Sequence, residues 1–189
     1  MTKKASLFVI SGPSGSGKSS LILDVLKNLD NFEKSISATT RPVRCGEKDG
    51  DQYHFISKDK FEEEIGEDSF LEWAEYSGYY YGTPKKFVES KLAAGINVIL
   101  EIEVQGAMQV MDSKCSAYYI FIVANTIEEL KKRLLKRGAD SLEEIEKRMV
   151  IAVEELKYKK HYDCIIVNNN YNEALQNLKE ILNGRIGRK

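Results

Sequence analysis

The fold class is decided by one stretch, Gly12-Pro13-Ser14-Gly15-Ser16-Gly17-Lys18-Ser19. It matches the phosphate-binding P-loop pattern, G-x-x-x-x-G-K-[ST], at every fixed position. The apolar residues 7–10 before it predict a short buried strand, and the apolar spacing of residues 20–29 predicts a helix after it. In that setting the glycines let successive backbone amides face one anion, and the helix N-terminus adds partial positive charge. The alternative, a glycine-rich turn without a ligand, is disfavoured by the complete motif between strand and helix.

The pattern also assigns chemistry to single residues of this loop. Lys18 is expected to neutralise the β- and γ-phosphate oxygens of a nucleoside triphosphate, and the hydroxyl of Ser19 is expected to ligate Mg²⁺. The residues expected to bind the triphosphate are Gly12, Pro13, Ser14, Gly15, Ser16, Gly17, Lys18, Ser19 and Ser20.

Composition excludes several other classes of protein. The 189 residues are 42% hydrophobic and 30% charged, and the net charge of −1 provides no general attraction to nucleic acid or membrane. No apolar run is long enough to span a bilayer, and the first strand follows the start too closely for a signal peptide. Three widely spaced cysteines, an odd number, suit free thiols in a reducing cytosol. We therefore expect a cytoplasmic protein with no nucleic-acid or membrane partner.

Strands and helices alternate along much of the chain. Segments rich in β-branched or aromatic residues predict core strands at 97–103, 117–123 and 164–167. Helices are expected at 84–94 and 172–182, and capping-box sequences that begin at Thr126 and Ser141 predict two more. This order predicts an α/β fold of the P-loop type, a parallel sheet with helices on both faces.

The region from about 37 to 81 interrupts this alternation. It combines an extended segment at 35–41, a polar loop at 42–50, strands at 53–56 and 70–76, a short helix at 58–65, and a turn or hairpin at 78–82. We expect a strand-rich lobe inserted into the α/β core.

Two groups of residues in this inserted region have side chains suited to a second substrate. Arg41 and Arg44 lie in an extended loop near Glu47 and Tyr53, and the planar guanidinium suits phosphate. The alternative for the two arginines is a solvated surface pair. The tyrosines at 79–81 offer hydroxyl donors, although at least one of them is expected to pack on the core.

Further charged residues lie outside the inserted region. Arg133, Arg137 and Arg148 flank Gly138 between the two capped helices, where a mobile lid would clamp phosphates. Two salt-bridged surface helices are the alternative. Glu101 and Glu103 end a core strand at the sheet edge where open α/β sheets bind ligands, and charge in an apolar strand is costly unless it is used or paired.

Together these residues resemble the guanylate kinase family over nearly the whole chain. The resemblance is carried by the segments 10–19, 37–47 (SATTRPVRCGE), 70–74 (FLEWA), 80–83 (YYGT) and 101–106 (EIEVQG). The run T-T-R-x-x-R-x-G-E is far more specific than the P-loop. The resemblance implies transfer of the γ-phosphoryl group of ATP to GMP, which gives ADP and GDP in purine nucleotide metabolism, with Mg²⁺ as cofactor.

The resemblance also implies a role for each matching residue. Ser37 and Glu72 would bind the guanine base with help from Thr83. Arg41, Arg44, Tyr53 and Tyr81 would hold the GMP phosphate, and Lys18, Arg137 and Arg148 would act on the ATP phosphates. The catalytic residues implied are Lys18, Arg41, Arg137 and Arg148. The GMP-binding residues implied are Ser37, Arg41, Arg44, Glu47, Tyr53, Glu72, Tyr81, Thr83, Glu101 and Glu103. Some family members have aspartate at the positions of Glu101 and Glu103, so the longer side chain changes the contact geometry there.

The domain division implied is a core (1–37, 84–125 and 150–189), a GMP-binding lobe (38–83) and a lid (126–149). Two alternatives follow from the same resemblance. Guanylate-kinase-like interaction modules use the nucleotide lobe to bind partners and typically have a degraded P-loop, whereas Lys18, Ser19, Arg41 and Arg44 are all present here. The second alternative is a kinase for another nucleoside monophosphate.

Overall fold

The main sheet of the protein is parallel and carries the P-loop at the end of its central strand. The computed structural model describes residues 5–76, 78–137 and 141–186. The order of the five strands is β2-β7-β1-β8-β9. Their bounds are β1 (Leu7–Ser11), β2 (Phe32–Lys34), β7 (Asn97–Glu101), β8 (Ala117–Val123) and β9 (Cys164–Val167). Every pairing between them is parallel, which confirms the predicted α/β class.

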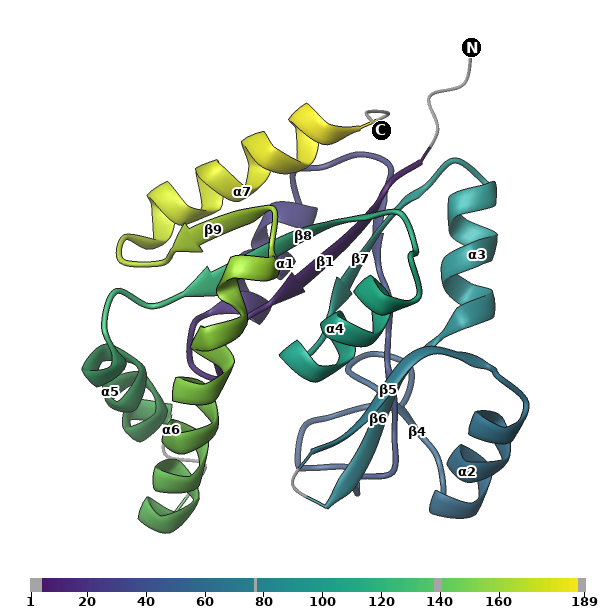
Figure 1. The fold of residues 1–189 in the computed structure, drawn as a ribbon, viewed down its shortest axis with the longest axis horizontal. Coiled ribbons are helices and arrows are strands. Elements are labelled where there is room, and N and C mark those ends of the chain that lie inside the picture. The colour runs from purple at the N-terminus through teal and green to yellow at the C-terminus, as the bar shows by residue number, and fades with distance from the viewer. Residues whose placement is uncertain (1–4, 77, 138–140, 187–189) are drawn as a thin grey trace.

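Helices cover both faces of this sheet, so its central strands are buried on both sides (Figure 1). On one face Phe8 and Ile10 pack with α1 (Lys18–Leu26) and α7 (Tyr171–Arg185). On the other, Val9 packs with α3 (Lys85–Ala93) and α4 (Val104–Asp112). Continuous apolar strands such as residues 7–10 are typical of a parallel sheet covered in this way.

The inserted region forms a second, four-stranded sheet in the order β4-β3-β6-β5. Its elements are β3 (Ala38–Thr39), β4 (His54–Phe55), α2 (Lys58–Gly66), β5 (Phe70–Tyr76) and β6 (Tyr79–Pro84). The rings of Phe61 and Phe70 stack at 4.4 Å between centroids and form a small core beneath it. Gly82 lies over these rings, where a Cβ atom would come within 2.9 Å of both.

Two further helices, α5 (Ile127–Arg137) and α6 (Leu142–Leu156), precede a 3₁₀ turn at Lys157–His161. The capping box predicted at Ser141 is present, since its hydroxyl accepts from the amide of Glu144 and the Glu144 carboxylate accepts from the Ser141 amide. Both the small sheet and the α5–α6 pair lie on the side to which the carboxyl ends of β1, β7 and β8 point (Figure 1). The predicted hinge at Gly138 lies outside the described residues.

Of the turn or hairpin predicted at 78–82, the hairpin is present, since β6 begins at Tyr79 and pairs antiparallel with β5 through Glu75↔Tyr80 and Ala74↔Tyr81. The aromatic residues of this segment favour a strand. Gly82 fits over the phenylalanine rings, and this packing overrides the tendency of glycine to form a turn. Other local predictions were wrong. The strand predicted at 97–103 ends at Glu101, and Glu103 is instead the N-cap residue of α4. β2 and α4 were not predicted. Among the described residues, no helix is long and apolar enough to cross a membrane.

Candidate active site

The P-loop backbone adopts a conformation that only glycine adopts readily. Gly12, Gly15 and Gly17 have φ angles of 142°, 86° and 91°. A Cβ atom on Gly12 would lie 2.0 Å from the carbonyl oxygen of Ile122 on the neighbouring strand. The fixed glycines of the motif are therefore required by both backbone angle and close packing.

Asn168, which follows β9, holds the P-loop from the side. It is 3% exposed, and its Nδ2 donates to the carbonyl of Ser16 at 2.8 Å. Arg133 of α5 donates to the carbonyl of Asn168 at 2.9 Å and to that of Ser16 at 3.5 Å. The sequence predicts Arg133 in a phosphate clamp. The structure instead brings both Asn168 and Arg133 against the P-loop backbone.

Lys18 is the first residue of α1 and lies inside the curve of the loop. It is 8% exposed, and its ammonium group donates to the carbonyls of Gly12 and, at 3.2 Å, Pro13. These neutral acceptors hold the charge in place without neutralising it. The ammonium group thus stays available to an anion bound by the loop. Ser20, which was also predicted to bind ATP, lies two residues after Lys18 in α1 and is exposed.

Ser19 and Glu101 form the place where a metal ion would fit. The hydroxyl of Ser19 donates to the carboxylate of Glu101, and Lys34 forms an ion pair with the second carboxylate oxygen. Burial raises the pKa of Glu101, but Lys34, Ser19 and Lys18 together outweigh it and hold that pKa below its usual value. A hydroxyl beside an ionised carboxylate suits Mg²⁺, which takes few protein ligands and fills its shell with water and phosphate oxygens.

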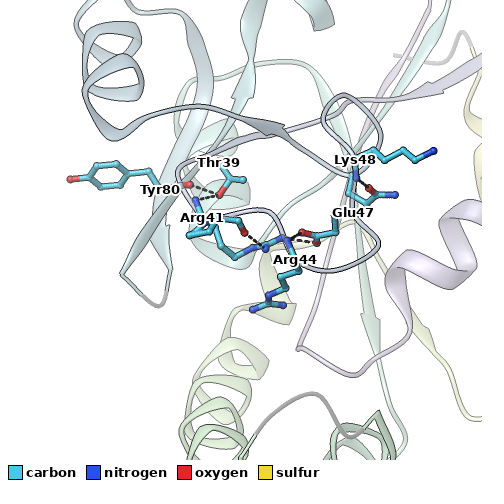
Figure 2. A network of polar contacts seen from close by, with 8 residues as sticks. Thr39, Arg41, Arg44, Glu47, Lys48 and Tyr80 are labelled. Carbon is cyan, nitrogen blue, oxygen red and sulfur yellow. Dashed lines mark hydrogen bonds and ion pairs between the residues drawn. The ribbon is translucent and has the colours of Figure 1, made fainter.

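Arg41 is held rigidly in the second sheet's loop. It is 7% exposed, and its Nη2 atom lies 2.7 Å from Oε1 of Glu47 (Figure 2). The guanidinium carbon lies 5.4 Å from the centre of the Tyr53 ring. Glu47 also accepts from the backbone amide of Arg44 at 2.8 Å, which shapes the loop, whereas the Arg44 side chain points away from this network (Figure 2). The hydrogen bond from Arg41 holds the pKa of Glu47 below its usual value.

Two of the three consecutive tyrosines, Tyr80 and Tyr81, have different surroundings. Tyr80 stacks on Phe61 and belongs to the core of the second sheet, as expected for at least one of them. Tyr81 instead faces Tyr53, with 5.7 Å between ring centroids. Burial raises the pKa of Tyr53 to about 12, so its hydroxyl remains a neutral donor at physiological pH. The structure therefore brings Arg41, Tyr53 and Tyr81 together as hydrogen-bond donors.

The residues predicted to read a base lie in one row across the second sheet. Glu72 pairs with Thr83 across β5 and β6, and Ser37 precedes Ala38, which pairs with Gly82. The hydroxyl of Thr83 donates to Oε1 of Glu72 at 2.6 Å, and both residues are buried. Burial, opposed in part by this hydrogen bond, raises the pKa of Glu72 to about 7. A buried carboxylate with one side-chain donor has acceptor capacity left for a ligand.

Glu155 of α6 is a site residue that sequence reasoning missed. It is buried, its carboxyl group lies within hydrogen-bonding reach of Glu103, and burial together with Glu103 raises its pKa to about 8. The only signal in the sequence is its place three residues after the buried Ala152 on one helix face. Arg148 on the same helix is half-buried, and its charge acts on Tyr76 at the end of β5. The side chain of Arg137 lies outside the described residues.

A P-loop at the end of the central strand, together with a second group of buried polar side chains on an inserted sheet, defines the class of P-loop kinases. The family model described as "Guanylate kinase" matches residues 4–185. The chain is 47% identical over 176 residues to guanylate kinase of Desulfitobacterium hafniense, covering 93% of this chain and 88% of that protein. It is 46% identical over 183 residues to guanylate kinase of Listeria innocua, covering 96% and 89%. The crystal structure of guanylate kinase from Anaplasma phagocytophilum matches with a TM-score of 0.82 at 30% identity, covering 100% and 89%.

The chain belongs to the guanylate kinase family. Its activity is the ATP-dependent phosphorylation of GMP to GDP, that of a nucleoside monophosphate kinase.

Proposed function

We propose that GMP binds on the inserted sheet, ATP binds at the P-loop, and the γ-phosphoryl group passes between Arg41 and Lys18. The observation that carries this assignment is the row Ser37, Thr83 and Glu72 across the small sheet whose β3 strand leads into the loop of Arg41. One end of that sheet supplies acceptors for a base, and the loop beside it supplies donors for a phosphate. The division into core, lobe and lid at the predicted boundaries is part of the proposal.

The guanine base is selected by hydrogen-bond direction. Guanine presents N1–H and the 2-amino group as adjacent donors, and an ionised Glu72 can accept from both. Thr83 donates to the other side of that carboxylate and holds it in place. The hydroxyl of Ser37 is then the donor left for the O6 atom of guanine. Adenine lacks both donors and would leave a buried carboxylate unpaired.

The phosphate of GMP is held by Arg41, Arg44, Tyr53 and Tyr81. Glu47 acts indirectly, because it fixes both the Arg41 side chain and the Arg44 backbone. An oxygen of this phosphate is already ionised at neutral pH, so the attack on ATP needs no general base. Rate enhancement then comes from alignment and charge neutralisation.

The ATP phosphates are bound by the P-loop residues 12–20, with Lys18 on the transferring group. A magnesium ion bound with ATP would spread the charge of that group, and Ser19, oriented by Glu101, would hold it. Arg137 and Arg148 complete the clamp from α5 and α6. Glu103 would contribute to GMP binding together with Glu155, whose carboxyl group lies within hydrogen-bonding reach of it. We place the reaction in the cytoplasm, where three free cysteines are compatible with reducing conditions.

Turnover of GMP, AMP, UMP and dTMP with ATP and Mg²⁺ tests this assignment of the second site. We expect GMP to exceed each of the others in kcat/KM by at least about 1,000-fold, because each of them lacks the paired donors that Glu72 requires. Comparable turnover of AMP would show that this row does not read the base. Absence of turnover with all four, together with tight GMP binding, would instead favour the role of an interaction module.

The raised pKa of Glu72 predicts a pH dependence of GMP binding. Below a pKa of about 7 the carboxyl group is mainly protonated and cannot accept from both guanine donors. The Kd for GMP is therefore expected to fall by about tenfold between pH 6 and pH 8. The GMP phosphate titrates near pH 6 as well, so the same titration of a Glu72→Gln variant measures that contribution. Identical pH profiles of the two proteins would contradict the assignment.

A further inference from the structure

The Glu72 carboxylate lies directly against helix α4, over Gly106. A Cβ atom built on Gly106 would be 2.1 Å from Oε2 and 2.9 Å from Cδ of Glu72, whereas ordinary contact begins at 3.4 Å. Gly106 is in the first turn of α4 and its φ angle is an ordinary helical one, so backbone conformation does not require glycine here. Glycine inside a helix is unfavourable, and close packing is the usual reason for it. The space beside Gly106 is occupied by the group that reads guanine.

Gln109 lies three residues further along α4, on the same face of the helix. Its side-chain amide makes two hydrogen bonds to the backbone of Trp73, accepting from the nitrogen at 3.2 Å and donating to the oxygen at 2.6 Å. Trp73 is the residue after Glu72 in β5. A core helix therefore fixes both the backbone and the side-chain space of the strand that carries Glu72.

We propose that Gly106 and Gln109 are positioning residues for guanine recognition, so that the selectivity of the inserted sheet is set by a helix of the core. Gly106 leaves the volume that the Glu72 carboxylate needs. Gln109 fixes the position of β5 against α4 through its hydrogen bonds to Trp73. This proposal rests on the role of Glu72 as the base reader. It adds that Glu72 can take that position only while α4 presents a glycine to it.

A methyl group at position 106 has a specific expected consequence. The clashing atoms are the end of a flexible side chain, so Glu72 can swing aside and the fold can survive. The carboxylate then leaves the row that it forms with Thr83, and a displacement of about 1 Å at such a site costs up to about 100-fold in rate. The effect should fall on GMP, because the three atoms nearest to a Cβ atom at position 106 all belong to Glu72.

The first experiment compares Gly106→Ala with Gly184→Ala, a glycine in α7 around which a Cβ atom meets nothing within 4 Å. For Gly106→Ala we expect the KM for GMP to rise by about 10- to 100-fold, with the KM for ATP within about twofold of the parent. Gln109→Ala should raise the KM for GMP in the same direction. Gly184→Ala should change neither constant. A KM for GMP that is unchanged in Gly106→Ala would overturn the proposal, while Glu72→Gln tests the base reader independently.

Thermal unfolding of a double-mutant cycle identifies the clash itself and does not depend on activity. Alanine favours helix over glycine, so Gly106→Ala should raise the Tm when it is made in a Glu72→Ala background, where the clashing carboxylate is gone. In the parent background the same substitution should lower the Tm or leave it unchanged. If Gly106→Ala lowers the Tm equally in both backgrounds, or prevents folding in both, Glu72 is not what the glycine accommodates and the proposal fails.

Discussion

Substitution of Lys18 by alanine is expected to lower kcat by at least about 1,000-fold while the protein stays folded. The ammonium group lies in the curve of the P-loop and donates to the neutral carbonyls of Gly12 and Pro13. It is therefore available to charge that develops on the transferring phosphoryl group, and its loss removes transition-state stabilisation. The measurement is steady-state kcat with saturating GMP and ATP, with circular dichroism to check the fold.

Lys27→Ala is the matched control for this substitution. Lys27 lies just after the same helix, pairs with Asp24 at the surface, and has a side chain 72% exposed. A surface ion pair of this kind contributes little to the stability of the fold, so kcat should stay within about twofold of the parent. A folded Lys18→Ala protein that turns over as fast as Lys27→Ala would remove Lys18 from the mechanism.

Substitution of Glu72 by glutamine is expected to lower kcat/KM for GMP by at least about 100-fold. The glutamine keeps one carbonyl oxygen for Thr83, but its amide group presents donors to the two donors of guanine. The KM for ATP should stay within about twofold of the parent, since Glu72 lies on the inserted sheet rather than the P-loop. Measured KM values for both substrates separate this local effect from general damage.

The same variant should be more stable than the parent protein without ligand at pH 8. Burial raises the pKa of Glu72 from 4.5 to about 7, so between these values the folded protein holds a proton that the unfolded chain has lost. The free energy of unfolding therefore falls as the pH rises through this window, by up to about 3 kcal/mol. Glutamine cannot ionise and avoids this loss. A binding group that destabilises the free protein is a common feature of functional sites.

The parts of this molecule that were predictable from sequence are those with local causes. The P-loop is specified by consecutive residues, and the strands predicted at 7–10 and 117–123 by uninterrupted apolar runs. The Ser141 capping box depends on residues only three apart, and it is present.

The contacts that complete the site join residues far apart in the chain, and no local pattern encodes them. Asn168 lies 152 residues from the Ser16 carbonyl that it binds. The helix carrying Gly106 escaped prediction because its N-cap residue is Glu103 rather than serine, threonine, aspartate or asparagine, and because glycine disfavours helix. Glu155 of α6 lies within hydrogen-bonding reach of Glu103, which is far from it in the sequence. Family resemblance named Glu72, but only the strand register shows why Thr83 accompanies it.

The central claim is that an ionised Glu72 selects guanine, and the most direct test is the ratio of kcat/KM for GMP to that for AMP in the parent and in Glu72→Gln. We expect a ratio of at least about 1,000 in the parent, reduced by at least about 100-fold in the variant, almost entirely through the loss of GMP use. A Glu72→Gln protein that keeps the full preference for GMP would contradict the claim and place the base reader elsewhere.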